Sequence, residues 1–240
     1  MVKLVYAIEM SDKKVKIDML YVAAVIPALV CLFIVYLADR HKERLSFVAR
    51  LYVLGALIVL PAGLMEKMLL DLYSATPDPQ TGFMATLMTA FFIAGVTEET
   101  AKGLVFQRFV LPKPFYDEPY DGVVYAVAIG LGFATVENVL YVTSDGLSTA
   151  FVRAFTAVPA HTLFGVVMGT YFSQSKFAQK PVFKAYAIPA FLHGLYDMFA
   201  LAQSFAANIA LIIYLMWLVR FACTKSAPLR RLTRKTYRVS

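Results

Sequence analysis

Three charged side chains lie at helical spacing inside an apolar stretch of this chain. Glu98, Glu99 and Lys102 belong to segment 83–110, which is long enough to cross a bilayer. Each buried charge costs roughly 2.5–3.5 kcal/mol on membrane-insertion scales. On a helix Lys102 lies one turn from either acid, so we expect it to pair with one of them. The second carboxylate then needs another partner, a wet cavity or a chemical role.

Other polar side chains fall at membrane depth in three later apolar segments. They are Glu137 and Asn138 in segment 120–143, His161 in segment 151–172, and His193 and Asp197 in segment 185–201. Counting 1.5 Å per residue places both imidazoles close to the bilayer midplane. Packing alone explains such groups on four segments poorly, so we expect them to converge on one hydrated pocket.

Carboxylates and imidazoles together suit the activation of water. A desolvated carboxylate beside an ammonium can serve as a general base. We expect Glu98 to be that base and His161 to position the water, with Lys102 fixing Glu99. The remaining candidates are His193 with Asp197 or Asn138 as holders of the oxyanion, and Glu137 as a reserve ligand or proton relay.

A metal site is the alternative use of the same residues. His161 and His193 with Glu98 or Glu99 would make an open zinc site, although no HExxH motif is present. The cofactor prediction is therefore either none or a divalent metal such as zinc.

Less specific explanations remain for the individual residues. An intramembrane histidine or Asn138 can simply join helices by a hydrogen bond, and Arg153 lies near enough to a span end to snorkel to the interface. A proton-coupled or ion-coupled transporter would also keep mid-membrane acids and histidines. A non-catalytic membrane scaffold is the third alternative.

The composition predicts an all-α, polytopic transmembrane helical bundle. Hydrophobic residues make up 60% of the 240 residues and charged residues 16%, against about 45–50% and 25% in soluble domains. Continuous apolar runs exclude the alternating pattern of a membrane β-barrel. About seven spans are expected, at 19–38, 47–64 with a kink at Pro61, 83–110, 120–143, 151–172, 185–201 and 205–222.

The charged residues predict the ends and the orientation of the chain. We divide it into an interfacial segment 1–18, the bundle 19–223 and a basic tail 224–240. Lys and Arg gather in alternate loops and the tail, which predicts a multi-pass protein of the cell membrane with a cytoplasmic C-terminus and an external N-terminus. The net charge of +7 is thus explained by topology, with anionic lipid as the tail's partner and no nucleic acid.

The order of several short motifs resembles the PrsW family of intramembrane proteases. The motifs are Glu98-Glu99-x-x-Lys102, Asp121-Gly122-Val123-Val124-Tyr125, Gly132-Phe133-Ala134-x-x-Glu137-Asn138-x-x-Tyr141, Arg153-Ala154-Phe155, Pro159-Ala160-His161 and His193-Gly194-x-x-Asp197. This resemblance implies an endopeptidase that clips membrane-anchored substrates, typically anti-sigma factors, outside the cytoplasm.

The family is similar to the CPBP group with its CAAX prenyl endopeptidases, in which the positions of Glu98, Glu99, His161, His193 and Asp197 form the site. That group's motif places an arginine one residue beyond Lys102. PrsW-like proteins have been classed as metalloproteases, whereas the CPBP comparison favours a metal-free glutamate mechanism.

Overall fold

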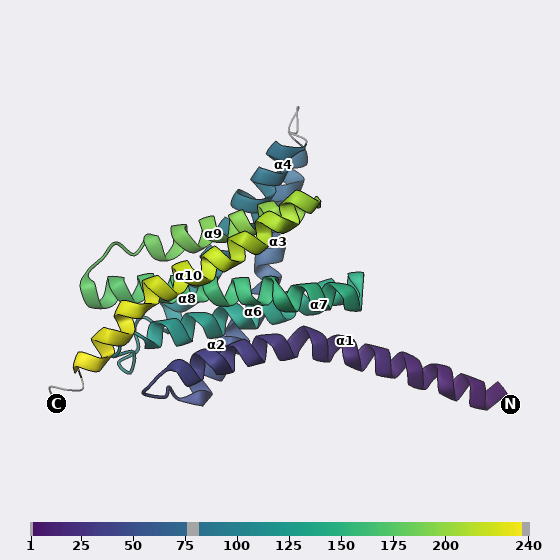
Figure 1. The fold of residues 1–240 in the computed structure, drawn as a ribbon, viewed down its shortest axis with the longest axis horizontal. Helices are drawn as coiled ribbons and strands as arrows, with labels where there is room; N and C mark the ends of the chain where they lie inside the picture. The colour runs from purple at the N-terminus through teal and green to yellow at the C-terminus, as the bar shows by residue number, and fades with distance from the viewer. Residues whose placement is uncertain (1, 76–81, 237–240) are drawn as a thin grey trace.

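The computed structural model describes residues 2–75 and 82–236, and all of its regular elements in these ranges are helices (Figure 1). In chain order they are α1 (Val2–Ala38), α2 (Leu45–Leu57), α3 (Val59–Ser74), α4 (Phe83–Leu87), the π-helix η1 (Met88–Gly95), α5 (Val96–Phe109), α6 (Asp121–Asp145), α7 (Leu147–Phe155), α8 (Ala157–Ala178), α9 (Lys184–Leu201) and α10 (Phe205–Thr236). The expected all-α bundle is confirmed.

Within the described ranges, five stretches are long and apolar enough to cross a membrane. They are Met19–Ala38, Leu45–Ser74, Asp121–Asp145, Leu147–Ala178 and Phe205–Leu229. The expected third span is divided among α4, η1 and α5, and the expected sixth is α9. The protein is therefore polytopic, and the count of seven spans stays a prediction.

The second span is interrupted just before its proline. α2 ends at Leu57 and α3 begins at Val59. The ring of Pro61 has no N–H to offer to the carbonyl of Leu57, four residues earlier, and it crowds that carbonyl. The predicted kink is thus present as a break between two helices, and α3 then continues to Ser74, beyond the expected end of the span at residue 64.

α6 is the central helix and packs against α1, α2 and α8. It approaches α8 backbone to backbone, because a Cβ added to Gly169 would lie only 2.1 Å from the carbonyl oxygen of Gly122. The outer helices α1, α3 and α10 instead expose many large apolar side chains, as lipid-facing helices do. The core therefore surrounds α6, and the functional side chains carried by α6 are held from several sides.

The basic connections gather at one end of the bundle. The α1–α2, α5–α6 and α8–α9 connections lie at the same end as the last turns of α10, while α1 begins at the opposite end (Figure 1). The side chains of residues 2–18, 230, 231 and 233–236, together with residues 1 and 237–240, lie outside the description, so the interfacial segment and the lipid-binding tail stay predictions.

Candidate active site

Lys102 binds both glutamates of α5 in the interior of the bundle. Its Nζ lies 2.9 Å from Oε2 of Glu98 and 2.7 Å from Oε1 of Glu99. Glu98 is 6% exposed, Glu99 1% and Lys102 2%. The expectation that the lysine pairs with only one acid is wrong, because positions three and four residues before it share its face of the helix. The ring of Phe133 lies 4.1 Å from the ammonium and adds a cation–π contact.

His193 on α9 joins this cluster from the other side. Its Nδ1 lies 3.0 Å from Oε1 of Glu99 and 3.8 Å from Oε2 of Glu98. Its Nε2 lies 3.4 Å from Oδ2 of Asp197, one turn further along α9. The two acids of α5 thus differ, since Glu99 is held closely by two cationic or donor groups and Glu98 closely by Lys102 alone.

The close packing of η1 against α9 brings His193 to the glutamates. A Cβ added at Gly95 would lie 2.7 Å from the carbonyl oxygen of Ala190 and 3.0 Å from the amide nitrogen of Gly194. Only glycine leaves room for this approach. The π-helix ends at Gly95, directly before the first turn of α5 with its two glutamates, and π-helical turns are common at functional sites.

His161 on α8 connects the α5 acids to α6. Its Nδ1 lies 3.2 Å from Nζ of Lys102 and its Nε2 lies 2.9 Å from Oε2 of Glu137. Because the ammonium has only hydrogens to donate, we infer that Nδ1 accepts and Nε2 carries the proton, which faces the Glu137 carboxylate. The centroids of the His161 and His193 rings are 5.2 Å apart. Glu137, expected to be a reserve ligand or proton relay, therefore contacts the cluster directly.

Arg153 and Asn138 support the cluster from outside. The Arg153 guanidinium lies 3.0 Å from Oε1 of Glu137, and its Nε donates to Oδ1 of Asn138 at 2.7 Å. The amide of Asn138 donates to the backbone carbonyl of Ala24 on α1 at 3.3 Å. The guanidinium of Arg153 therefore turns toward Glu137 and Asn138, contacts that the expected snorkelling does not include. Asn138 joins helices, since its amide oxygen and nitrogen bond to Arg153 and Ala24.

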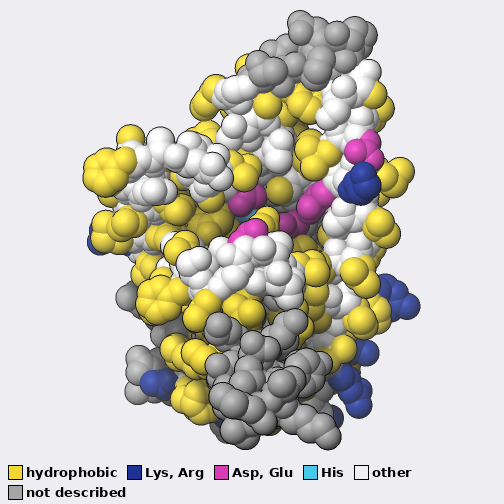
Figure 2. All heavy atoms as spheres, turned by 90° about the vertical axis from the view of Figure 1, so that its right-hand side faces the viewer, with side chains coloured by type: hydrophobic (Ala, Val, Ile, Leu, Met, Phe, Trp, Pro, Cys, Tyr) yellow, Lys and Arg dark blue, Asp and Glu magenta, His cyan; other side chains and the backbone are white. Residues whose placement is uncertain are grey.

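A polar hollow leads to the cluster at the end of the bundle where α1 begins. Figure 2 shows acidic side chains inside this hollow. Three partly exposed acids, Glu66, Glu137 and Asp197, lie within electrostatic reach of the cluster. Glu66 lies outside the spans expected from the sequence, yet it is on α3 within electrostatic reach of Glu98. Extending the second span beyond residue 64 as a helix would have included this residue.

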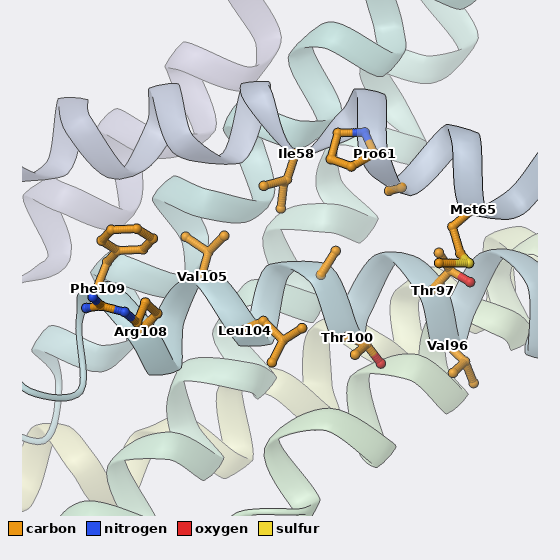
Figure 3. Close-up of a pocket in the computed structure, with 12 residues that line it drawn as sticks. Ile58, Pro61, Met65, Val96, Thr97, Thr100, Leu104, Val105, Arg108 and Phe109 are labelled. Atoms are coloured by element: carbon orange, nitrogen blue, oxygen red, sulfur yellow. The ribbon is translucent and has the colours of Figure 1, made fainter.

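A separate groove lies on the other face of α5, against α3. It has a volume of about 600 Å³, and apolar side chains such as Ile58, Met65 and Leu104 line it (Figure 3). Thr97 and Thr100 are its polar members on α5, and Arg108 lies near one end. The glutamates project from the opposite face of the helix and do not line this groove.

The donor set of the cluster fits a zinc ion by residue type and spacing. Glu98, Glu99, His161 and His193 each offer an atom within 4.8 Å of the others, and carboxylates with imidazoles are common zinc ligands. The Lys102 ammonium lies within 3.2 Å of three of these four side chains. A metal ion and this ammonium would therefore compete for the same lone pairs.

The protein combines membrane-spanning helices with a buried cluster of acids and histidines. It is therefore a polytopic membrane protein with a polar site between its spans. Residues 43–223 match the PrsW family, described as a family of intramembrane metalloproteases. The protein named Protease PrsW from Geobacillus kaustophilus is 39% identical over 187 residues, which cover 75% of this chain and 79% of that protein. The protein of the same name from Oceanobacillus iheyensis is 32% identical over 85% of this chain and 94% of its own length. That from Bacillus subtilis is 32% identical over 81% of this chain and 89% of its own length. No solved structure matches the chain. The chain belongs to the PrsW family of intramembrane proteases, and its activity is peptide hydrolysis.

Proposed function

We propose that Glu98, Glu99, His161 and His193, together called the acid–histidine cluster, cut a peptide bond of a membrane-anchored protein. Glu98 is the general base. The asymmetry of the two glutamates carries this proposal. Glu99 contacts Lys102 at 2.7 Å and His193 at 3.0 Å, whereas Glu98 has one close partner and lies 3.8 Å from His193. Glu98 is therefore the acid with lone pairs left for a water molecule.

The reaction follows from the groups around Glu98. Its carboxylate takes a proton from water as the water oxygen bonds to the scissile carbonyl carbon. His161 borders this position and orients the water through its Nε2–H, which it shares with Glu137. When the tetrahedral intermediate collapses, the carbon–nitrogen bond breaks and Glu98 returns the proton to the leaving amine.

The oxyanion requires donors near the reacting carbon. His193 supplies one through Nε2, because the contact of Nε2 with Asp197, at 3.4 Å, is longer than that of Nδ1 with Glu99, at 3.0 Å, and is easier to exchange. Lys102 is the second source of positive charge and fixes Glu99 throughout.

A divalent metal is compatible with the same residues. His161, His193 and Glu98 or Glu99 would hold a zinc ion, which when bound polarises a carbonyl and acidifies water. Metal analysis of the purified protein, together with cleavage assays with and without a chelator, separates the two forms of the mechanism. Stoichiometric zinc with loss of activity in chelator supports the metal form, and full activity in metal-free protein supports the glutamate form.

The proposed substrate is a single-span protein, for example an anti-sigma factor, cut first on the extracytoplasmic side. The hollow supports this assignment, because it opens at the end of the bundle opposite the basic connections (Figure 2). With seven spans in the cell membrane, positive-inside then places the hollow and the N-terminus outside and the C-terminus in the cytoplasm. The basic tail would rest on anionic lipid there.

Cleavage in proteoliposomes tests the proposal. The substrate is a labelled single-span anti-sigma factor, and the variants are Glu98→Gln and Glu99→Gln, with Asp71→Asn on the exposed face of α3 as the control. We expect Glu98→Gln to slow cleavage by about 10²–10⁴-fold, as for a lost general base, and Asp71→Asn to cut normally. Wild-type rates in both glutamine variants would remove the mechanism.

A further inference from the structure

A second group of carboxylates lies far from the candidate active site. Asp39 and Glu43, at the α1–α2 connection, meet Asp121, the first residue of α6. Each offers an oxygen within 4.8 Å of the others. Glu137 lies sixteen positions after Asp121 on α6, so the two residues are about 24 Å apart along the helix axis at the helical rise. This acidic cluster is therefore independent of the acid–histidine cluster.

The carboxylates of this acidic cluster are buried without enough partners. Asp39 is 3% exposed and Asp121 0%. Both carboxylate oxygens of Asp39 and Oδ1 of Asp121 accept no hydrogen bond. The other oxygen of Asp121 accepts the amide N–H of Glu118 at 2.8 Å, and the hydroxyl of Tyr125 donates to Glu43. Buried acceptors without donors cost about 1–3 kcal/mol each, and more when they are charged.

Nearby basic side chains that the structure describes form no hydrogen bond to these carboxylates. Lys42 donates to the backbone carbonyl oxygens of Tyr36 and Leu37, at 2.9 and 2.8 Å, and to that of Asp39. In the described ranges no lysine or arginine forms an ion pair with any of the three acids. Burial raises the pKa of Asp39, and burial followed by the charge of Asp39 raises the pKa of Glu43.

We propose that Asp39, Glu43 and Asp121 bind a hard divalent cation, Mg²⁺ or Ca²⁺. The available donors are all oxygens, which these ions prefer and zinc or copper do not. Ligand oxygens on opposite sides of Ca²⁺ lie about 4.8 Å apart, those on opposite sides of Mg²⁺ about 4.2 Å apart, and adjacent ligands are closer. Since the three oxygens lie within 4.8 Å of one another, the carboxylates can close around one Ca²⁺ ion, or by a further approach around Mg²⁺, and the ion neutralises their charge.

The consequence of binding is a tie between the α1–α2 connection and the start of α6. Asp39 and Glu43 come from the loop that joins the first two spans, and Asp121 begins the helix around which the core is built. Because the cation binds only when these segments are together, it stabilises the folded bundle in proportion to its concentration.

Terbium luminescence and thermal unfolding of the full chain in detergent test the site. Tb³⁺ is an oxygen-seeking probe, and Tyr125 beside Glu43 can sensitise it. We expect the wild type to bind Tb³⁺, to release it when Ca²⁺ or Mg²⁺ is added, and to show a higher Tm in one of these ions than in chelator. Asp39→Asn and Glu43→Gln should lower the affinity for Tb³⁺ at least tenfold and abolish the shift in Tm.

Two further variants separate this site from others. Asp145→Asn changes an exposed aspartate at the other end of α6 and should bind as the wild type does. Glu98→Gln should also keep the luminescence, whether or not the proposed protease mechanism is right. Equal Tb³⁺ affinity in Asp39→Asn, Glu43→Gln and the wild type would overturn the proposal, and so would a Tm that neither ion changes. Either result would mean that protons, not a metal, neutralise these acids.

Discussion

Replacing Lys102 with methionine should destabilise the bundle more than any other single loss of charge at the site. The variant keeps a long apolar stem but leaves Glu98 and Glu99 without their shared cation, which lies 2.9 and 2.7 Å from them. Removing one partner of a buried ion pair costs about 3–5 kcal/mol. For a chain of this size that corresponds to a fall in Tm on the order of 6–20 °C, measured by thermal unfolding in detergent.

Two comparisons make this prediction sharp. Lys67→Met removes an i,i+4 pair with Asp71 whose side chains are 71% and 67% exposed, so it should cost about 0–1 kcal/mol. The triple variant Lys102→Met, Glu98→Gln, Glu99→Gln removes the ammonium and both acids together, and it should recover most of the lost stability because no charge is left unpaired. A Tm of Lys102→Met within experimental error of that of Lys67→Met would refute the reasoning, since the acids would then not depend on the lysine.

Two further variants probe the supports of the site. Glu137→Gln removes the charge opposite Nε2 of His161, and we expect proteolysis to slow by about 10–100-fold with a smaller fall in Tm than in Lys102→Met; unchanged kcat would show that the contact is not needed. Gly95→Ala places a methyl group 2.7 Å from the carbonyl oxygen of Ala190, so it should cost about 1–3 kcal/mol and impair cleavage. Gly63→Ala, where nothing lies within 4 Å of the new Cβ, is the control and should be neutral or slightly stabilising; equal effects of the two alanines would contradict the packing argument.

The members of the site were predictable because charge in an apolar segment is rare. The cost of burying Glu98, Glu99 and Lys102 marks them in the sequence without any knowledge of the fold. The same reasoning found His161 and His193, and the structure brings all five together. Helical spacing also showed that Lys102 can reach both acids, but not that it binds both at once.

What the sequence missed depends on geometry that a linear pattern does not contain. A regular helix was expected through segment 83–110, and η1 interrupts it with wider turns that no residue type specifies. Arg153 was assigned to the interface by its position near a span end, whereas the partner that attracts it, Glu137, comes from another helix. Glu66 was missed because the second span was expected to end at residue 64, whereas the chain continues as α3 to Ser74.

The hydrogen bond from Asn138 to Ala24 links the first span to the reaction centre. From Ala24 the connection passes through Asn138, Arg153 and Glu137 to His161, although α1 precedes the residues that match the family. The acceptor on α1 is a main-chain oxygen, so the bond does not depend on the side chain at position 24, but Ala24 is fully buried and leaves room only for a small residue. Exchange of Ala24 for glycine or serine would leave proteolysis intact, whereas a change in the tilt or depth of the first helix, for instance in a thicker bilayer, would be transmitted to the imidazole of His161, which we propose to be catalytic.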